Sequence, residues 1–406
     1  MSFDLDEYVQ SKLPIEELKA YLPRVSKVEV HGVHPDMEII AGLDLNFRII
    51  EVVAESKRKE DNSNSLRPVF IFAKRGSEFL LVCCVTPGRD LLVHYSSMLG
   101  YFLRRYPRIT MSVFSYPVAE QHIELWTELD ENLVRPDDIV ILGYSTFLKH
   151  SLHSDALFPT LSVRRNDFYT STRFLADSGV VVNCLEANYG YWGNISERLS
   201  RKVCEFGAKE IIHIGKVGTL GHPSEVYKRI YIPSRFLIVR RGDVIHSAVD
   251  IQNSLGADRA NSSSAHASVS TTMEETLHQR ELMSEHNVDT IDIESSKIAY
   301  GIARYNAQTG GKVRFGAIHY STDYLRMRHE LYEKFEYDLS VKSSTFLKGK
   351  KNKILEQISV ILQEYVNSYT HHTLKSRQDG KLAMSEKTPK LAQKPTRGAS
   401  PVSRIP

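Results

Sequence analysis

The sequence predicts an α/β fold, with a three-layer domain built on a central mixed sheet at residues 131–370 and a smaller α+β domain before it. Short apolar runs at 139–143, 180–184 and 210–214 have the composition of buried strands. Helix-period segments separate these runs, and this alternation favours a mostly parallel sheet covered by helices. The length of 406 residues also fits two domains better than one.

The first 130 residues predict the smaller domain. The expected elements are a helical segment over 1–25, one or two strands over 36–55, a charged loop over 57–65, a hairpin of strands 69–73 and 79–85, a helix over 91–103 and a strand over 109–116. No motif here indicates chemistry. We therefore expect residues 1–130 to form an accessory or oligomerisation domain, with a lid over a substrate site as the alternative.

The larger domain begins near Arg135-Pro136-Asp137-Asp138, where a proline and acids mark a boundary. The expected elements are strands 139–143 and 180–184, a glycine-rich loop 187–193, helix 194–206, strand 210–214, a β-ribbon 230–245, strand 266–272, helix 274–287, strand 288–293, a helix after Glu294, a strand ending near Asp323 and an amphipathic helix 354–366. Open α/β sheets bind ligands at the carboxyl ends of their strands, so these ends are the candidate site.

Charge is unevenly distributed along the chain. The net charge is +3, but residues 371–406 carry eight Lys or Arg against two acids, so this tail is +6 and the rest about −3. We expect the polar tail to be disordered, and a nucleic-acid-binding body is not indicated. The four cysteines show no metal-ligand or disulfide spacing, and no signal peptide or membrane-length apolar run is present. We expect a cytoplasmic protein that binds neither nucleic acid nor membrane.

Three strand ends carry residues suited to chemistry. Asp292-Ile293-Glu294 places two carboxylates where a strand gives way to a helix, and Thr322-Asp323 ends another strand. Gly215-Lys216-Val217-Gly218 predicts a turn after a strand, where backbone N–H groups can hold an anion. Each has a structural alternative, because acids are stabilised at helix N-termini and glycine turns are common.

This set of residues resembles the nucleoside phosphorylase superfamily. The nearest match is to its hexameric purine nucleoside phosphorylases and to the nucleosidases that cleave methylthioadenosine and adenosylhomocysteine. The resemblance covers about residues 131–370 and does not extend to the first 130 residues or the tail. It implies the three-layer fold and cleavage of an N-glycosidic bond.

The resemblance also implies roles for the acids. The family's acid–apolar–Glu pattern places a Glu on the ribose hydroxyls, which corresponds to Glu294 here, supported by Asp292. The family's Ser-Asp, here Thr322-Asp323, supplies an Asp that donates a proton toward purine N7. Glu294 and Asp323 are therefore the expected catalytic residues. Carboxyl groups suit both tasks, because a carboxylate can hold a diol and a carboxylic acid can protonate the leaving base.

The nucleophile side departs from the family pattern. The family's first loop reads Gly-Asp-Pro-x-Arg, whereas Gly143 is followed here by Tyr-Ser-Thr-Phe, with Phe147 at the Arg position. His213 stands where another Arg is common, and Lys216 stands where the family has a hydroxyl. The hexamers also reach across a subunit interface with an Arg in the region of Arg165. The expected phosphate or nucleophile side is Gly143, Arg165, His213, Lys216 and Gly218, and its departures favour hydrolysis, or a substrate with its own phosphate, over strict phosphorolysis.

Further substrate contacts are expected from Tyr189, Gly190, Ser270 and Thr322. An aromatic ring beside a glycine can stack on a base or ribose, although a core or interface role fits Tyr189 equally well. His266 and His319 lie near the same strand ends. A single histidine in a strand is more often structural, so these two are expected to be structural.

The sequence therefore predicts an enzyme that cleaves the N-glycosidic bond of a purine nucleoside or nucleotide-like compound, by water or phosphate. The alternative is a nucleoside-binding or scaffold protein that kept the fold and lost turnover. No metal or organic cofactor is expected, and inorganic phosphate stays open as a co-substrate. The family's assemblies imply a homo-oligomer, either a dimer or a trimer of dimers.

Overall fold

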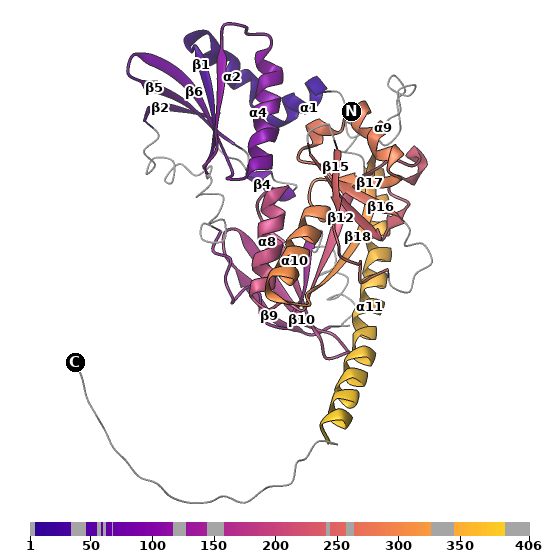
Figure 1. The fold of residues 1–406 in the computed structure, drawn as a ribbon. Coiled ribbons are helices and arrows are strands. Elements are labelled where there is room, and N and C mark those ends of the chain that lie inside the picture. Colours follow the sequence, from indigo (N-terminus) through magenta and orange to yellow (C-terminus); the bar gives the residue numbers. More distant parts are fainter. Residues whose placement is uncertain are drawn as a thin grey trace, which may run out of the picture.

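The computed structural model describes residues 5–33, 46–54, 58–59, 62–66, 68–116, 127–143, 158–240, 244–256, 264–325 and 345–385. In these residues the strands form a five-stranded sheet, an eleven-stranded sheet and one small hairpin. Figure 1 shows the five-stranded sheet and its helices at the top left, above the larger sheet. No helix in the described part of the chain is long and apolar enough to cross a membrane.

The five-stranded sheet and its helices are called the N-terminal unit here. Its helices are α1 (Leu5–Lys12), α2 (Ile15–Tyr21), η1 (Leu22–Arg24) and α4 (Arg89–Leu103). Its strands are β1 (Lys27–Gly32), β2 (Arg48–Ala54), β5 (Val69–Arg75), β6 (Glu78–Val85) and β7 (Thr110–Phe114), in the order β2-β5-β6-β1-β7. The predicted hairpin, helix and last strand are thus confirmed. The charged loop prediction was wrong in part, because β3 (Arg58–Lys59) and β4 (Asn62–Leu66) pair within it.

The larger sheet is mixed, as predicted. Its strands are β8 (Ile139–Gly143), β9 (Thr160–Arg165), β10 (Tyr169–Leu175), β11 (Val181–Ala187), β12 (Glu210–Thr219), β13 (Ile230–Tyr231), β14 (Arg235–Arg240), β15 (Val244–Ala248), β16 (Ala265–Ser268), β17 (Val288–Asp292) and β18 (Arg314–Tyr324). The order is β15-β14-β16-β17-β12-β8-β11-β10-β9, with β18 paired to β12 and to β13. β12 runs parallel to β8 and β18 but antiparallel to β17.

Helices cover both faces of this sheet. On one face lie α8 (Asn194–Glu205) and α10 (Ser295–Thr309), which pack side by side, and on the other lies α11 (Thr345–Ser385). Successive side chains of a strand point to opposite faces of the sheet. In β8, Val140 and Leu142 therefore pack with α8 and α10, while Ile139 and Ile141 pack with α11. Short helices η2 (Pro223–Glu225), η3 (Thr272–Glu274) and α9 (Leu277–Glu285) complete the described elements. The three-layer prediction is therefore confirmed.

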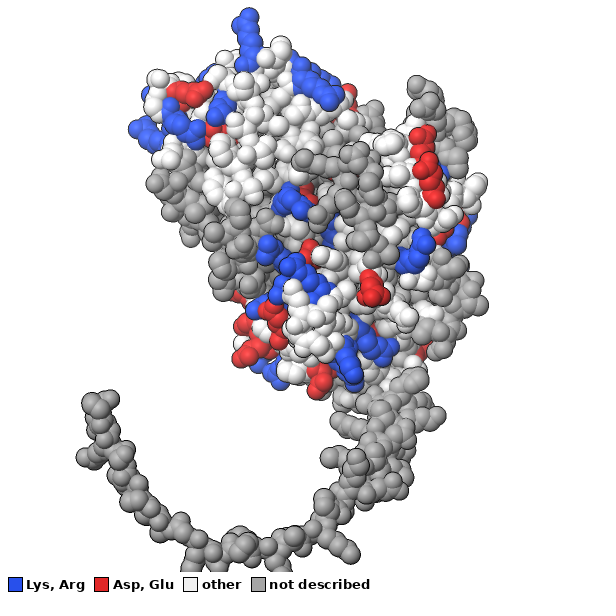
Figure 2. Space-filling model, in the orientation of Figure 1, with Lys and Arg blue, Asp and Glu red and all other residues white. Residues whose placement is uncertain are grey.

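The outer surface of α8 and α10 carries mixed charge. Arg201 and Lys202 both approach Glu205, and Arg304 approaches Glu197, at distances of 3.2–3.4 Å. Figure 2 shows blue and red side chains interleaved on the lower part of this face. Such exposed pairs stabilise a helix surface by only about 0.3–0.5 kcal/mol each.

Several predicted boundaries were wrong: the strand expected over 266–272 ends at Ser268, the helix expected over 274–287 spans Leu277–Glu285, and two larger differences concern β12 and the last helix. The strand expected to end at residue 214 continues to Thr219, because it pairs with both β17 and β18 near its end. The Gly215–Gly218 segment is therefore part of a ladder and not a turn. The last helix extends from Thr345 to Ser385, beyond the expected end at residue 366, and residues 386–406 lie outside the described ones.

A truncation tests which part of the C-terminal region holds the fold. The last side chain of α11 that the structure describes in the hydrophobic core is Tyr369. Deleting residues 371–406 removes none of these core contacts, so we expect the melting temperature to change by less than about 3 °C in differential scanning fluorimetry. The matched control is Leu362→Ala, a core position of α11, which should lower the free energy of unfolding by about 2–4 kcal/mol. A truncation as damaging as Leu362→Ala would show that this region packs on the body.

Candidate active site

The candidate site lies at the carboxyl end of β12. Gly218 pairs with Ile291 of β17 on one side and with Asp323 of β18 on the other. A side chain at Gly218 would lie 2.5 Å from Leu325 and 3.3 Å from the Asp323 carboxylate, so glycine permits the close approach. The structure thus brings the strand ends that carry Asp292, Glu294 and Asp323 to one edge of the sheet.

Asp292 caps helix α10. Its carboxylate accepts hydrogen bonds from the backbone N–H groups of Glu294 and Ser295, and from Ser268 Oγ at 2.5 Å. His266 Nε2 lies 2.9 Å from Oδ1 of the same carboxylate. Burial favours the neutral form, but the contact with His266 outweighs it and holds the pKa of Asp292 below its ordinary value. Asp292 is therefore an ionised, fully engaged anchor, as its predicted supporting role requires.

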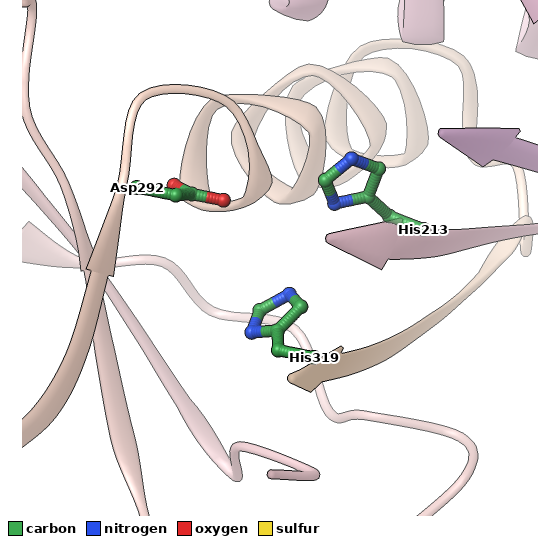
Figure 3. A group of neighbouring side chains, drawn as sticks. All are labelled: His213, Asp292 and His319. Carbon is green, nitrogen blue, oxygen red and sulfur yellow. The ribbon is translucent and has the colours of Figure 1, made fainter. Parts of the chain in front are cut away.

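The Ser295 hydroxyl is the centre of a buried network. It donates a hydrogen bond to Asp292 Oδ2, and it lies 2.8 Å from His213 Nδ1 and 3.0 Å from His319 Nε2. Figure 3 shows His213 and His319 reaching this point from neighbouring strands, with Asp292 opposite them. Burial lowers the pKa of His213 to about 4 and that of His319 well below its ordinary value. A hydroxyl donates once and accepts twice, so neutral imidazoles satisfy it completely.

His213, Asp292 and His319 also have the side-chain types of a metal site. One ligand atom each from His213, Asp292 and His319 lies within 4.8 Å of the others. However, the Ser295 oxygen already occupies the point on which they converge. Among the described residues His319 Nδ1 has no hydrogen-bond partner, whereas metal-binding histidines usually donate from the other ring nitrogen. The N-terminus of α10 also disfavours a cation. The geometry supports a hydrogen-bonded network that fixes α10.

Glu294 stands at the N-cap position of α10, immediately after this network. The only hydrogen bond to its carboxyl group among the described residues comes from the backbone N–H of Ile293 at 3.3 Å, and no ion pair to that carboxyl occurs there. Burial first, and then the Asp292 charge, raise the pKa of Glu294 to about 8. Lys216 and Lys297 oppose this shift, and Tyr191 lies close enough for its own pKa to be raised by Glu294. A partly buried carboxyl is thus left without a cation partner.

Asp323 is nearly buried, with 9% of its surface exposed, and it accepts a hydrogen bond from the Thr322 hydroxyl at 3.0 Å. Sequence reasoning missed Glu275, a buried carboxyl between η3 and α9. Burial, and then the Asp323 charge, raise the pKa of Glu275 well above its ordinary value. Asp292 and Glu294 act on it in the same direction, which places Glu275 among the three predicted acids. Four carboxyl groups therefore share this end of β12.

The predicted phosphate side is not assembled in the described part of this chain. Gly215 and Gly218 lie in the β12–β18 ladder, Lys216 is exposed, and His213 is engaged by Ser295. Gly143 has φ +94° and packs against the backbone of Ile214, so it serves strand packing. Arg165 lies on β9, four strands from β12 and thus about 19 Å away across the sheet. Phe147 and the rest of 144–157 lie outside the described residues.

The other predicted contacts divide into two groups. Tyr189 is fully buried and its hydroxyl pairs with that of Tyr169, which favours the core role that the sequence left open beside a substrate contact. Gly190 follows it and is also buried. Thr322 bonds to Asp323, and the backbone N–H of Ser270 donates to the carboxylate of Glu274, next to Glu275. His266 and His319 hydrogen-bond to Thr290 and Ser295, which is consistent with the expected structural role.

Several site residues left no local signal in the sequence. Ser295 and Ser296 read as an ordinary first helical turn, and Glu275 as a helix-opening acid. Tyr191 was one of three aromatics around Gly190, and nothing distinguished it from Tyr189. Lys297 was not singled out in the sequence, and it is buried. A lysine flanked by Ser-Ser and Ile-Ala in a helix is the one pattern that could have indicated burial.

The comparisons with known proteins give two different results. No family model matches the chain. A curated protein named Oxidoreductase cns1, from Cordyceps militaris, is 27% identical over an alignment of 390 residues, and the match covers 90% of this chain and 48% of that protein. The chain thus spans about half the length of this relative.

Solved structures give distant matches. A 5'-methylthioadenosine/S-adenosylhomocysteine nucleosidase from Neisseria meningitidis has a TM-score of 0.41 and 13% identity, covering 57% of this chain and 99% of its own. A futalosine hydrolase of Helicobacter pylori has 0.39 and 12%, covering 57% and 99%. A purine nucleoside phosphorylase from Toxoplasma gondii has 0.40 and 14%, covering 59% and 96%. TM-scores of this size do not identify a family, so the proposed function rests on the residues of the site.

The network around Ser295 predicts a large stability loss in Ser295→Ala. The change leaves two imidazole nitrogens and one Asp292 oxygen buried without their shared partner, so we expect about 2–4 kcal/mol less stability in urea unfolding. Ser359→Ala is the matched control, since it removes a buried serine whose hydroxyl makes one local bond to the Leu355 carbonyl. This control should lose about 1 kcal/mol or less.

A metal held by His213, Asp292 and His319 would give a different outcome. Added Zn²⁺ would then raise the melting temperature of the wild type, and a chelator would lower it. The control is His222→Ala, which changes an exposed histidine. An effect of Zn²⁺ or chelator that disappears in His319→Ala but persists in His222→Ala would contradict the hydrogen-bonded network.

Proposed function

We propose that this protein cleaves the N-glycosidic bond of a purine nucleoside or nucleotide-like substrate at the carboxyl end of β12. The observation that carries the proposal is the Glu294 carboxyl, which has no cation partner in the described part of the chain. Its neighbour Asp292 is fully engaged, so Glu294 alone is available to a ligand's hydroxyls. We also propose that the reaction needs no metal or organic cofactor.

Glu294 would grip the ribose. A carboxylate accepts hydrogen bonds from two vicinal hydroxyls at once, and these bonds strengthen as the ring gains positive charge. The backbone N–H of Ile293 and the Asp292 cap fix the carboxyl at the first turn of α10. Such fixed placement reduces the entropy lost when the substrate reaches its reactive geometry.

Asp323 would protonate the leaving base. An anionic purine leaves poorly, so a carboxyl that donates a proton at N7 lowers the barrier. Asp323 lies beside Glu275, and burial raises the pKa of the Glu275 carboxyl well above its ordinary value. A carboxyl with a raised pKa can hold a proton within the acidic group.

Water is favoured over phosphate as the nucleophile. A free phosphate dianion needs several cations and backbone N–H groups held together. In the described part of the chain those N–H groups belong to the β12–β18 ladder, and Lys216 is exposed while Arg165 lies four strands away. A substrate that carries its own phosphate could still use Lys216 as a point charge.

A nucleoside-binding protein without turnover is the second candidate. The unassembled phosphate side favours it, because a protein that only binds its ligand has no need to hold a nucleophile. The retained pair of Glu294 and Asp323 argues against it, since binding alone does not require an acid at the base. An oxidoreductase activity, suggested only by the name of the half-matched relative, has no supporting residue in the described part of the candidate site.

Substitution of the two acids tests their roles. We expect Glu294→Gln and Asp323→Asn each to lower kcat/KM by about 100-fold or more, because one removes the ribose grip and the other the proton. Both changes are nearly isosteric, so circular dichroism and the melting temperature should stay close to those of the wild type. Glu285→Gln, an exposed acid at the end of α9, is the control and should keep full activity. Normal turnover in Glu294→Gln or Asp323→Asn would remove that residue from the mechanism.

The identity of the products decides between the nucleophiles. Incubation of the wild type with a panel of purine nucleosides and nucleotides should release free base and free sugar without added phosphate. Chromatography of both products is the measurement. Base release that requires millimolar phosphate and yields a pentose 1-phosphate would reverse the preference for water. Tight binding of a nucleoside with no release of base would support the second candidate.

A further inference from the structure

Lys297 is a buried cation on the helix that carries Glu294. It lies three residues after Glu294 in the first turn of α10, and residues at this spacing share one side of a helix. Only 3% of its side chain is exposed. Its ammonium acts on the Glu294 carboxyl, because it is one of the charges that oppose the raised pKa of that group. Lys297 is thus the cation best placed to neutralise Glu294.

The ammonium of Lys297 is held elsewhere. It donates to Asp90 Oδ2 at 2.7 Å and to the Val269 carbonyl at 2.9 Å. Asp90 belongs to α4 of the N-terminal unit and is 1% exposed. A charged lysine that is buried needs a carboxylate partner, so the choice of partner decides whether Lys297 leaves Glu294 unpaired.

The contact between Asp90 and the larger sheet is tightly built. Asp90 Oδ2 also accepts from the backbone N–H of Asn194 at 2.9 Å, and Arg89 Nε lies 3.1 Å from Oδ1. Gly193 has φ +60°, and any side chain there would overlap the Asp90 carboxylate. The backbone N–H of Gly193 in turn donates to the Ile293 carbonyl at 3.0 Å, directly before Glu294. Asp90 is therefore linked to the Glu294 region in two ways. One is the side chain of Lys297, and the other is the backbone of Gly193 and Asn194, which bonds to Ile293.

Helix α4 also holds the segment that leads to Glu275. His94 Nδ1 lies 2.7 Å from Thr271 Oγ1, and Tyr8 of α1 lies 2.9 Å from Thr272 Oγ1. His94 is fully buried and packs edge-on against Trp192 at 5.1 Å. The N-terminal unit therefore contacts the segments that carry both Glu275 and Glu294.

We propose that Asp90 is a positioning residue that holds Lys297 away from Glu294, and that the N-terminal unit in this way keeps the Glu294 carboxyl open for substrate. This rests on the proposed role of Glu294 as the group that binds ribose hydroxyls. Without Asp90, the Lys297 ammonium would take the nearest carboxylate in the same buried region. The groups that face Glu294 are Asp292 from β17, Lys216 from β12, Tyr191 from the loop before α8, and Glu275, besides Lys297 itself.

The proposal is tested with Asp90→Asn, Lys297→Met and the double variant. In the wild type kcat/KM should fall as the pH drops below about 8, because substrate needs the Glu294 carboxylate and protonation removes it. We call this fall of kcat/KM on the acidic side the acid limb. In Asp90→Asn the freed Lys297 ammonium stabilises the Glu294 carboxylate, so the acid limb should move down by about one pH unit or more. The released lysine also blocks the carboxyl, so kcat/KM at pH 8 should fall about 10-fold or more.

The double variant separates positioning from simple loss of stability. Asp90→Asn with Lys297→Met removes the competing cation, so the acid limb should return to the wild-type pH and kcat/KM should recover to within about threefold. Asp138→Asn is the matched control, because Asp138 is a buried carboxylate paired with Arg173 at 2.7 Å in the same sheet, away from Glu294. It should lower the melting temperature but leave the acid limb in place.

Two results would overturn the proposal. One is a folded Asp90→Asn protein whose acid limb does not move, and the other is a double variant no more active than Asp90→Asn. If Asp90→Asn does not fold, Lys297→Met alone decides, because the proposal expects it to keep activity and to leave the limb at or above the wild-type pH. Activity as low as that of Glu294→Gln would contradict it.

A readout without substrate separates this proposal from the proposed function. A protonated buried carboxyl gives its own carbonyl band, so an infrared difference spectrum between wild type and Glu294→Gln reports the protonation of Glu294. The band should titrate above neutral pH in the wild type and at a lower pH in Asp90→Asn. This shift without any release of base would uphold the effect of Asp90 while the proposed reaction fails. A band that does not shift in Asp90→Asn, together with normal release of base, would contradict the proposed effect of Asp90 and leave the proposed function standing.

Discussion

The Asp292 carboxylate is the constraint on which the candidate site depends. It receives two backbone N–H groups of α10, the Ser268 hydroxyl from β16 and the Ser295 hydroxyl, which in turn contacts His213 of β12 and His319 of β18. One carboxylate therefore ties four strands to one helix. Each buried donor would cost about 1–3 kcal/mol if left unpaired, so the place where β17 ends and α10 begins is strongly fixed.

This anchor also explains why two neighbouring acids differ. Asp292 takes the available donors, and its pKa lies below the ordinary value. The Glu294 carboxyl accepts one backbone N–H. Burial and the negative charge of Asp292 raise its pKa to about 8. Environments that push two titratable groups apart in this way are typical of sites that divide labour between carboxyl groups. The difference follows from hydrogen-bond geometry, because the two side chains are only two residues apart.

The sequence was a good guide where local patterns decide the structure. Strand alternation and helix periodicity located most elements, and the strand-end rule located Glu294 and Asp323. It failed at Gly215–Gly218, because glycines suggest a turn and only pairing with both β17 and β18 keeps β12 extended. It also missed the Lys297–Asp90 pair, whose partners are 207 positions apart. The hydrogen-bonded network around Ser295 forms only where four segments meet, and no spacing of residues within one segment predicts that meeting.

The contacts of α4 bear on the role of the N-terminal unit, for which a lid was the alternative to an accessory domain. A lid must detach repeatedly, and its contacts are therefore drawn from the weak end of the stability range. Here detachment would expose a core shared by Leu91 and Ile195, and it would part Asp90 from Lys297. Separating a buried ion pair costs about 3–5 kcal/mol when it leaves a charge uncompensated. These contacts favour the expected accessory role of the unit over the alternative of a lid.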